Sequence, residues 1–172
     1  DECIGSACIH RRQFRCSTIM LLSENLHLAE VTKSQTATRL GIDNTPKIEH
    51  LKALRAVANN IFQNVREHFN VPIAVTSGYR SEALNEAIGG SKSSQHSKGE
   101  ALDLDADVFG GIENSHIFHY IEMSLVFDQL IWEFGDEENP AWVHCSYKAN
   151  GENRMEVLMA SKVNGKTKYT KL

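Results

Sequence analysis

The most regular pattern in the chain is a series of apolar residues at helical spacing within residues 45–69. The series consists of Ile48, Leu51, Leu54, Val57, Ala58, Ile61, Phe62 and Val65. This spacing predicts an amphipathic helix that packs one face against a core. Thr45 is suited to cap the helix, and Pro46 is suited to its first position. Shorter helices are predicted over residues 23–41, 81–88 and 113–125.

Residues 101–108 alternate between apolar and acidic side chains, and this period of two predicts a half-buried strand. Its two predicted faces are Leu102, Leu104, Ala106 and Val108 on one side, and Asp103, Asp105 and Asp107 on the other. Further strands are predicted over residues 71–77, 128–134, 141–147 and 155–161. Helices first, followed by strands joined through short turns, predict an α+β domain with a small, mostly antiparallel sheet packed against helices.

The two ends of the chain lack these patterns. Residues 1–22 are predicted to be a disordered leader and residues 164–172 a solvated tail, which leaves 23–163 as a single domain. With 172 residues, of which 41% are hydrophobic, the chain is long enough to bury one core. No apolar run approaches the roughly 18 residues that span a bilayer, and the charged start at Asp1 and Glu2 does not resemble a signal peptide.

Charge and cysteine content narrow the function classes. A net charge of -4 gives no basic surface for nucleic acid and no cationic tail for membranes, so neither partner is expected. Cys145 alternates away from His144 and is predicted to be a core thiol. Three cysteines near the start have spacings that fit no zinc-finger pattern well, although with His10 they form a candidate zinc set: Cys3, Cys8 and Cys16.

Three side chains form the strongest candidate site. Asp103 and His144 lie on predicted strands, and His96 lies in the polar loop that precedes the first of them. Two imidazoles and one carboxylate are a ligand set of catalytic zinc, because they leave a coordination position open for water. Asp105 is the best candidate for the carboxylate partner of a ligand histidine, and an ordinary charge on the strand face is the equal alternative. His116 and His119 also have chelating spacing, but no third ligand is predicted near them.

A wider pattern surrounds these residues. Ser-Gly-Tyr-Arg-Ser at 77–81 precedes the His-x6-Asp arrangement, and Trp-Val-His at 142–144 follows it. From about residue 26 to residue 147 the chain resembles the zinc D-alanyl-D-alanine carboxypeptidase-like peptidases, a group that includes phage endolysins and shares its fold with the hedgehog signalling domain. The resemblance implies that His96, Asp103 and His144 bind one zinc ion and that Arg80 is a cation on the substrate side.

The chain departs from the resemblance at one position. Many members of the group carry the catalytic carboxylate three residues before the last histidine, where this sequence has Ala141. Glu133, on an otherwise apolar strand that faces its hairpin partner, is the predicted replacement as general base. Glu137 and Glu138 are the alternatives, interpreted as solvated turn charges. Before the metal loop, Ser94 and Gln95 are candidates either for substrate hydrogen bonds or for loop solvation and capping.

The resemblance therefore predicts a zinc-dependent peptidase that hydrolyses bonds in peptidoglycan stem peptides. Both a D-Ala-D-Ala carboxypeptidase and an L-Ala-D-Glu endopeptidase fit the residues. Without a signal peptide, the enzyme is expected to be a monomer in the cytoplasm of a bacterial or phage-infected cell, acting on the wall after release. The alternatives are a non-catalytic, metal-stabilised binding or virion-assembly module and, with less support, a zinc amidase.

Overall fold

The computed structural model describes residues 20–172. The described chain starts with a small antiparallel hairpin, β1 (Leu21–Ser23) and β2 (Leu26–His27), followed by the short helices α1 (Leu28–Thr32) and α2 (Gln35–Leu40). Gly41 ends α2 in the left-handed conformation, at φ 64°. The predicted leader thus extends too far, because Leu22 is buried in the core. Residues 1–19, with Cys3, Cys8, Cys16 and His10, lie outside the described part.

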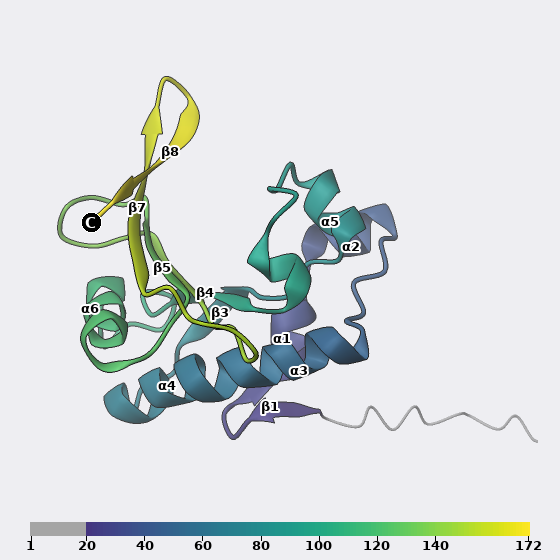
Figure 1. Ribbon diagram of the computed structural model, residues 1–172, viewed down its shortest axis with the longest axis horizontal. Helices are drawn as coiled ribbons and strands as arrows, with labels where there is room; N and C mark the ends of the chain where they lie inside the picture. The colour runs from purple at the N-terminus through teal and green to yellow at the C-terminus, as the bar shows by residue number, and fades with distance from the viewer. Residues whose placement is uncertain (1–19) are drawn as a thin grey trace, which may run out of the picture.

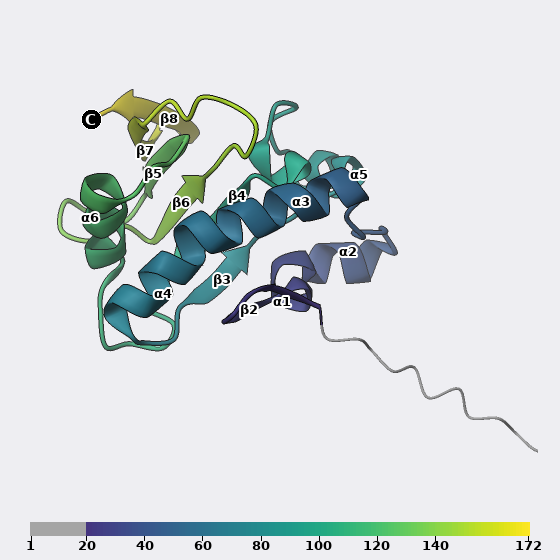
Figure 2. The ribbon, with the colours of Figure 1, turned by 60° about the horizontal axis from the view of Figure 1, so that its bottom comes forward.

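The long predicted helix is present as three consecutive segments: α3 (Ile48–Val57), the π-helical turn η1 (Ala58–Phe62) and α4 (Gln63–Phe69). Lys47 is the N-cap, so the prediction that Thr45 caps the helix is wrong. Leu54, Val57 and Ile61 from the predicted apolar series are fully buried. The helix crosses one face of the main sheet (Figure 2) and supplies much of the core beneath it.

Two more helices and one 3-10 turn lie between the strands: α5 (Glu82–Ala87), η2 (Gln95–Lys98) and α6 (Asn114–Ser124). Ser81 caps α5 through its hydroxyl, which accepts a hydrogen bond from the Leu84 amide. The predicted helices at 81–88 and 113–125 are therefore confirmed. Within residues 20–172 no helix combines the length and the apolar character that crossing a bilayer requires.

The main sheet has six strands in the order β3-β4-β6-β5-β7-β8 (Figure 2). The strands are β3 (Ala74–Ser77), β4 (Ala101–Asp105), β5 (Gln129–Glu133), β6 (Trp142–Ser146), β7 (Glu156–Val163) and β8 (Lys166–Lys171). The α+β class is confirmed, but the sheet is mixed, because β5 and β7 run parallel. The chain that follows β6 crosses beyond the start of β5 to the far side of that strand. β7 therefore begins beside the start of β5 and runs in the same direction.

Strand β8 replaces the predicted solvated tail. Its side chains are all exposed, as expected for a tail, but its backbone pairs with β7 along its whole length, from Leu158 opposite Lys171 to Val163 opposite Lys166. The turn of this hairpin projects away from the helices (Figure 1). The alternation predicted for residues 101–108 also ends early, because the chain turns after Ala106 and Val108 is 57% exposed.

The two faces of the sheet differ in character. One face carries the side chains that pack against α3, η1 and α6, among them Leu102, Leu130, Trp132 and Cys145. Side chains alternate across a strand, so the residues between them point to the other face. That second face includes Asp103, Ile131, Glu133 and His144, and it lines an open pocket of about 1000 Å³. The fold thus buries one face as core and leaves the other for the polar residues.

Candidate metal centre

The register of the central strands brings two of the three predicted ligands together. Asp103 on β4 lies directly opposite His144 on β6, and Ile131 on β5 lies opposite His144 on its other side. Residues directly opposite each other in an antiparallel pair have Cβ atoms about 5 Å apart. Both ligand side chains therefore leave rigid, paired backbone on the same face of the sheet.

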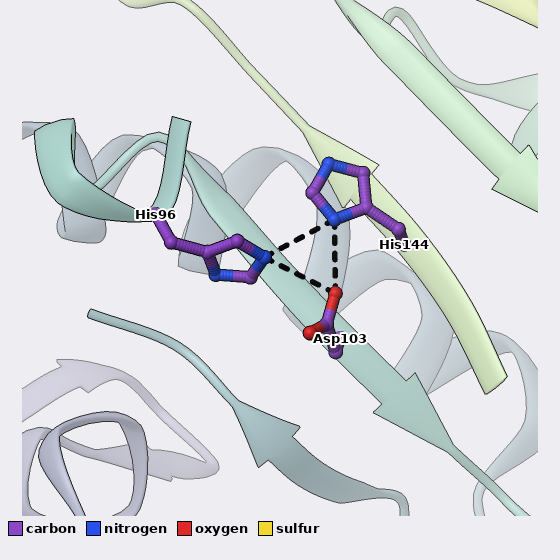
Figure 3. A group of neighbouring side chains, drawn as sticks. All are labelled: His96, Asp103 and His144. Atoms are coloured by element: carbon purple, nitrogen blue, oxygen red, sulfur yellow. Dashed lines mark hydrogen bonds and ion pairs between the residues drawn. The ribbon is translucent and has the colours of Figure 1, made fainter. Parts of the chain in front are cut away.

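The third predicted ligand, His96, reaches the same point from η2 (Figure 3). Its Nε2 atom lies 3.2 Å from Nδ1 of His144 and 3.2 Å from Oδ1 of Asp103. The triangle closes with 2.9 Å between His144 Nδ1 and Asp103 Oδ1. All three residues are buried, with exposed fractions of 4% for His96, 6% for Asp103 and 7% for His144.

A backbone carbonyl fixes the tautomer of His96. The Nδ1 atom of His96 lies 2.7 Å from the carbonyl oxygen of Gly78, which can only accept, so Nδ1 carries the proton. The lone pair is then on Nε2, the atom that faces the other two ligands. Gly78 is at this position because a Cβ atom would come within 2.5 Å of the Cβ of Val31 on α1. The prediction that Asp105 supports a ligand histidine is wrong, since its carboxylate accepts from Asn114.

Arg80 orients the Asp103 carboxylate. Its NH2 group donates to Oδ2 of Asp103 at 3.0 Å, and its Nε donates to the Ser77 hydroxyl at 2.9 Å. Oδ1 of Asp103 is thereby left for the histidines. Burial by itself raises the pKa of Asp103, but His96 and His144 outweigh it and hold that pKa well below its usual range. The carboxylate is ionised at neutral pH, as a metal ligand must be.

Glu133 lies in the same pocket as the three ligands and is 7% exposed. It lies opposite Trp142, two residue pairs along β5 and β6 from the pair of Ile131 and His144. Its carboxylate makes no hydrogen bond to any side chain or backbone group of residues 20–172. Burial raises the pKa of Glu133 to about 7, although the neighbouring His144 opposes this change.

The alternative acids lie elsewhere. Glu137 and Glu138 are exposed in the turn before β6, outside the pocket, and Ala141 is exposed as well. Among the acids weighed from the sequence as general base, Glu133 is therefore the one that shares the pocket with the ligands. Its role in catalysis stays a prediction.

A buried carboxylate that is not one of the three ligands, Asp128, fixes the segment that carries His96. Asp128 has no exposed surface. Its oxygens accept hydrogen bonds from Arg154 Nη2 at 2.7 Å, from Lys148 Nζ at 2.9 Å and from Gln95 Nε2 at 2.9 Å. Asp128 thus joins η2, the start of β5 and the connection between β6 and β7.

Gln95 and Ser94 both line the pocket, as a role in substrate binding requires. The Gln95 amide nitrogen is engaged by Asp128, and Ser94 occupies the N-cap position of η2 without a side-chain capping bond. Neither the substrate role nor the loop role predicted for them is decided by these contacts. No sequence signal marked Asp128, because its cationic partners come from an irregular loop.

The remaining candidates do not form a second centre. Cys145 has no exposed surface and points to the core, and burial raises the pKa of its thiol, so it is the predicted core thiol. His119 is exposed and faces Glu122, while His116 accepts from the Glu113 amide. Within residues 20–172, the ligand atoms of three such residues converge at one place: His96, Asp103 and His144.

The geometry of the three atoms fits zinc. Ligand atoms at 2.0–2.1 Å from a tetrahedral zinc ion lie roughly 3.3 Å from one another, close to the triangle described above. The lone pair on His96 Nε2 and the ionised Asp103 supply the required donors. Three protein ligands at the wall of an open pocket are the arrangement of a catalytic zinc site, because an ion held by them would keep a fourth position for water or substrate. The fold and the site thus define a metallohydrolase-type centre.

Comparison with known proteins specifies the class. Residues 24–146 match the family model described as Peptidase M15. The match covers most of the chain, including all three ligands, and the chain belongs to this family of zinc D-alanyl-D-alanine carboxypeptidase-like metallopeptidases. None of the curated proteins compared with the chain matches it.

The purified protein is expected to bind about one zinc ion per chain, and His96→Ala is expected to lower the affinity for zinc by at least 10²-fold, because two ligands remain. Inductively coupled plasma mass spectrometry after dialysis, followed by titration with a zinc chelator, measures both quantities. His119→Ala, which removes an exposed histidine outside the triangle, should keep full zinc. Equal zinc content in wild type and His96→Ala would contradict the assigned ligands.

Proposed function

We propose that the protein is a zinc-dependent peptidase that hydrolyses peptide bonds in the stem peptides of peptidoglycan. The observation that carries the proposal is the convergence of His96, Asp103 and His144 in one pocket with the unpaired carboxylate of Glu133. Membership of the M15 family supports the same chemistry. The absence of an acid at position 141 does not favour the non-catalytic alternative, because Glu133 lines the same pocket as the ligands.

The chemistry divides between the metal and the protein. Zinc, when bound, lowers the pKa of a coordinated water to about 7 and polarises the substrate carbonyl. Glu133 accepts the proton of the attacking water and later passes it to the leaving amine. Burial raises the pKa of Glu133 to about 7, and a divalent cation held by the three ligands would lower it and so favour the ionised carboxylate that accepts a proton.

Arg80 is proposed to bind a carboxylate of the substrate. Its side chain is 23% exposed and lines the pocket, while Nε and one NH2 proton are used by Ser77 and Asp103. A guanidinium has five N–H donors, so others remain for a ligand. Stem peptides carry several carboxylates, which suits both a terminal and an internal cut. Action on the wall after release from the cytoplasm, as a monomer, stays a prediction.

Digestion of purified peptidoglycan tests the proposed function. Zinc-loaded protein is expected to release stem-peptide fragments, and mass spectrometry of the fragments identifies the bond that is cut. Walls containing either diaminopimelate or lysine at the third stem position should both be tried, with protein dialysed against a chelator as the control. Full zinc content without release from either wall would favour the binding-module alternative.

A further inference from the structure

The β7–β8 hairpin forms part of the pocket although it follows the segment that matches the M15 family. The family match ends at residue 146, whereas β7 and β8 cover Glu156–Val163 and Lys166–Lys171. From β8, Tyr169 lines the same pocket as Glu133 and His144. The family match therefore assigns no role to this side chain.

The sheet register places Tyr169 on the side of Glu133. Glu133 on β5 lies opposite Ala160 on β7, and Ala160 lies opposite Tyr169 on β8. All three side chains point to the pocket face. The side chain between Glu133 and Tyr169 is thus only the methyl group of Ala160, which leaves space between the two on the pocket face. Ala160 is nevertheless 1% exposed, so larger neighbours cover it.

The phenol of Tyr169 is available as a donor. Its hydroxyl makes no hydrogen bond within residues 20–172, and the residue is 52% exposed. Burial and then the negative charges of Glu133 and Asp103 raise the pKa of Tyr169 above its ordinary value. The hydroxyl therefore keeps its proton at neutral pH and lies close enough to both carboxylates to sense their charge.

Two cationic side chains that line the pocket each have a partner within the protein. Lys162 donates to the Thr167 hydroxyl at 3.0 Å and lies 5.1 Å from the centre of the Phe134 ring. Arg80 is held by Asp103 and Ser77 on the opposite side of the ligands. A neutral, protonated and unpaired phenol on the Glu133 side of the pocket is suited to bind an oxygen that becomes negative during the reaction.

We propose that Tyr169 is a catalytic residue whose hydroxyl donates a hydrogen bond to the carbonyl oxygen of the scissile peptide as negative charge develops on it. The proposal rests on the proposed peptidase function. The phenol keeps its proton throughout, so no proton transfer is assigned to it. A donor that is directed at the developing oxyanion acts mainly on the transition state and therefore on kcat.

Tyr169→Phe tests this assignment with little risk to folding, because the residue is half exposed and the ring is kept. We expect kcat to fall on the order of 10²-fold, with KM within about twofold and zinc content unchanged. The substrate is the soluble wall fragment that the wild type cuts. A phosphinate analogue of the cleaved bond, which mimics the tetrahedral species, should bind the variant more weakly by a similar factor.

The control is Thr170→Val, the neighbouring β8 residue whose side chain points to the opposite face and lies opposite Met159. It should behave as wild type, which separates loss of the phenol from disturbance of the strand. A kcat within twofold of wild type in Tyr169→Phe would overturn this inference alone. If zinc-loaded wild type cuts neither wall, the proposed function fails and the role of Tyr169 fails with it.

Discussion

Glu133→Gln is expected to lower kcat roughly 10²- to 10⁴-fold while zinc content stays at the wild-type level. Glutamine has nearly the same shape as glutamate, but its amide cannot accept the proton of the attacking water. Glu133 is not among the three converging ligand atoms, so its replacement leaves the metal site intact. The measurement is the rate of fragment release from peptidoglycan together with metal analysis of the same samples.

Two matched variants make this test specific. Glu137→Gln and Glu138→Gln remove the same charge from the exposed turn that precedes β6, and both should digest the wall at the wild-type rate. In the wild type, activity should decline as the pH falls, since the base must be ionised. The remaining activity of Glu133→Gln should decline less steeply, because the coordinated water still titrates but the base does not. Normal digestion by Glu133→Gln would show that another group is the base.

Arg154→Met is expected to reduce the free energy of unfolding by about 2 kcal/mol, because it removes charged hydrogen bonds to the buried Asp128 carboxylate, while the half-exposed position of Arg154 limits the loss. Arg154 donates to both oxygens of Asp128 through Nε, at 3.1 Å in each case. Lys148 and Gln95 still donate to Asp128 in this variant, so the expected loss of stability is smaller than for a buried ion pair that loses all of its partners. Urea unfolding followed by the fluorescence of Trp132 and Trp142 measures the change.

The pH dependence of this loss has a definite sign. Burial alone raises the pKa of Asp128, but hydrogen bonds from Arg154, Lys148 and Gln95 outweigh it and hold that pKa well below its usual range. A carboxyl with a lowered folded pKa stabilises the protein above its unfolded pKa of about 3.9, and this contribution disappears as the pH falls through the folded value. The difference between wild type and Arg154→Met should therefore be constant above about pH 5 and narrow below pH 4.

A double-mutant cycle separates the ion pair from loss of packing. Asp128→Asn combined with Arg154→Met removes the buried charge together with its partner, so the double variant should lose less stability than the sum of the single variants. Arg39→Met, on the exposed surface of α2, is the neutral control. Strict additivity of the two changes would contradict the coupling described here.

Much of the metal centre could be predicted from the sequence because its ligands lie on strands with a clear period of two. Alternation alone put Asp103 and His144 on the polar faces of their strands, and Glu133 stood out as the acid of an apolar strand. The register between strands then brought these faces together. The alternation is local in the sequence, whereas the register is set by pairing between segments about forty residues apart.

Other features depended on tertiary contacts that leave no local pattern. The histidine partner is the backbone carbonyl of Gly78, which no side-chain pattern reveals, and Asp105 was chosen wrongly in its place. Asp128 is buried by cations from an irregular connection. Strand β8 was missed because both of its faces are exposed, so its side chains show no apolar alternation even though its backbone is fully paired with β7.

The position of β8 at the end of the strand order also affects how copies of the protein meet. A terminal strand offers unpaired backbone N–H and C=O groups to any other extended chain, which is a route to intermolecular sheets and aggregation. β8 carries Lys166, Lys168 and Lys171 among its six residues. Two copies pairing through this edge would bring like ammonium charges together, and their repulsion protects the open edge without covering it.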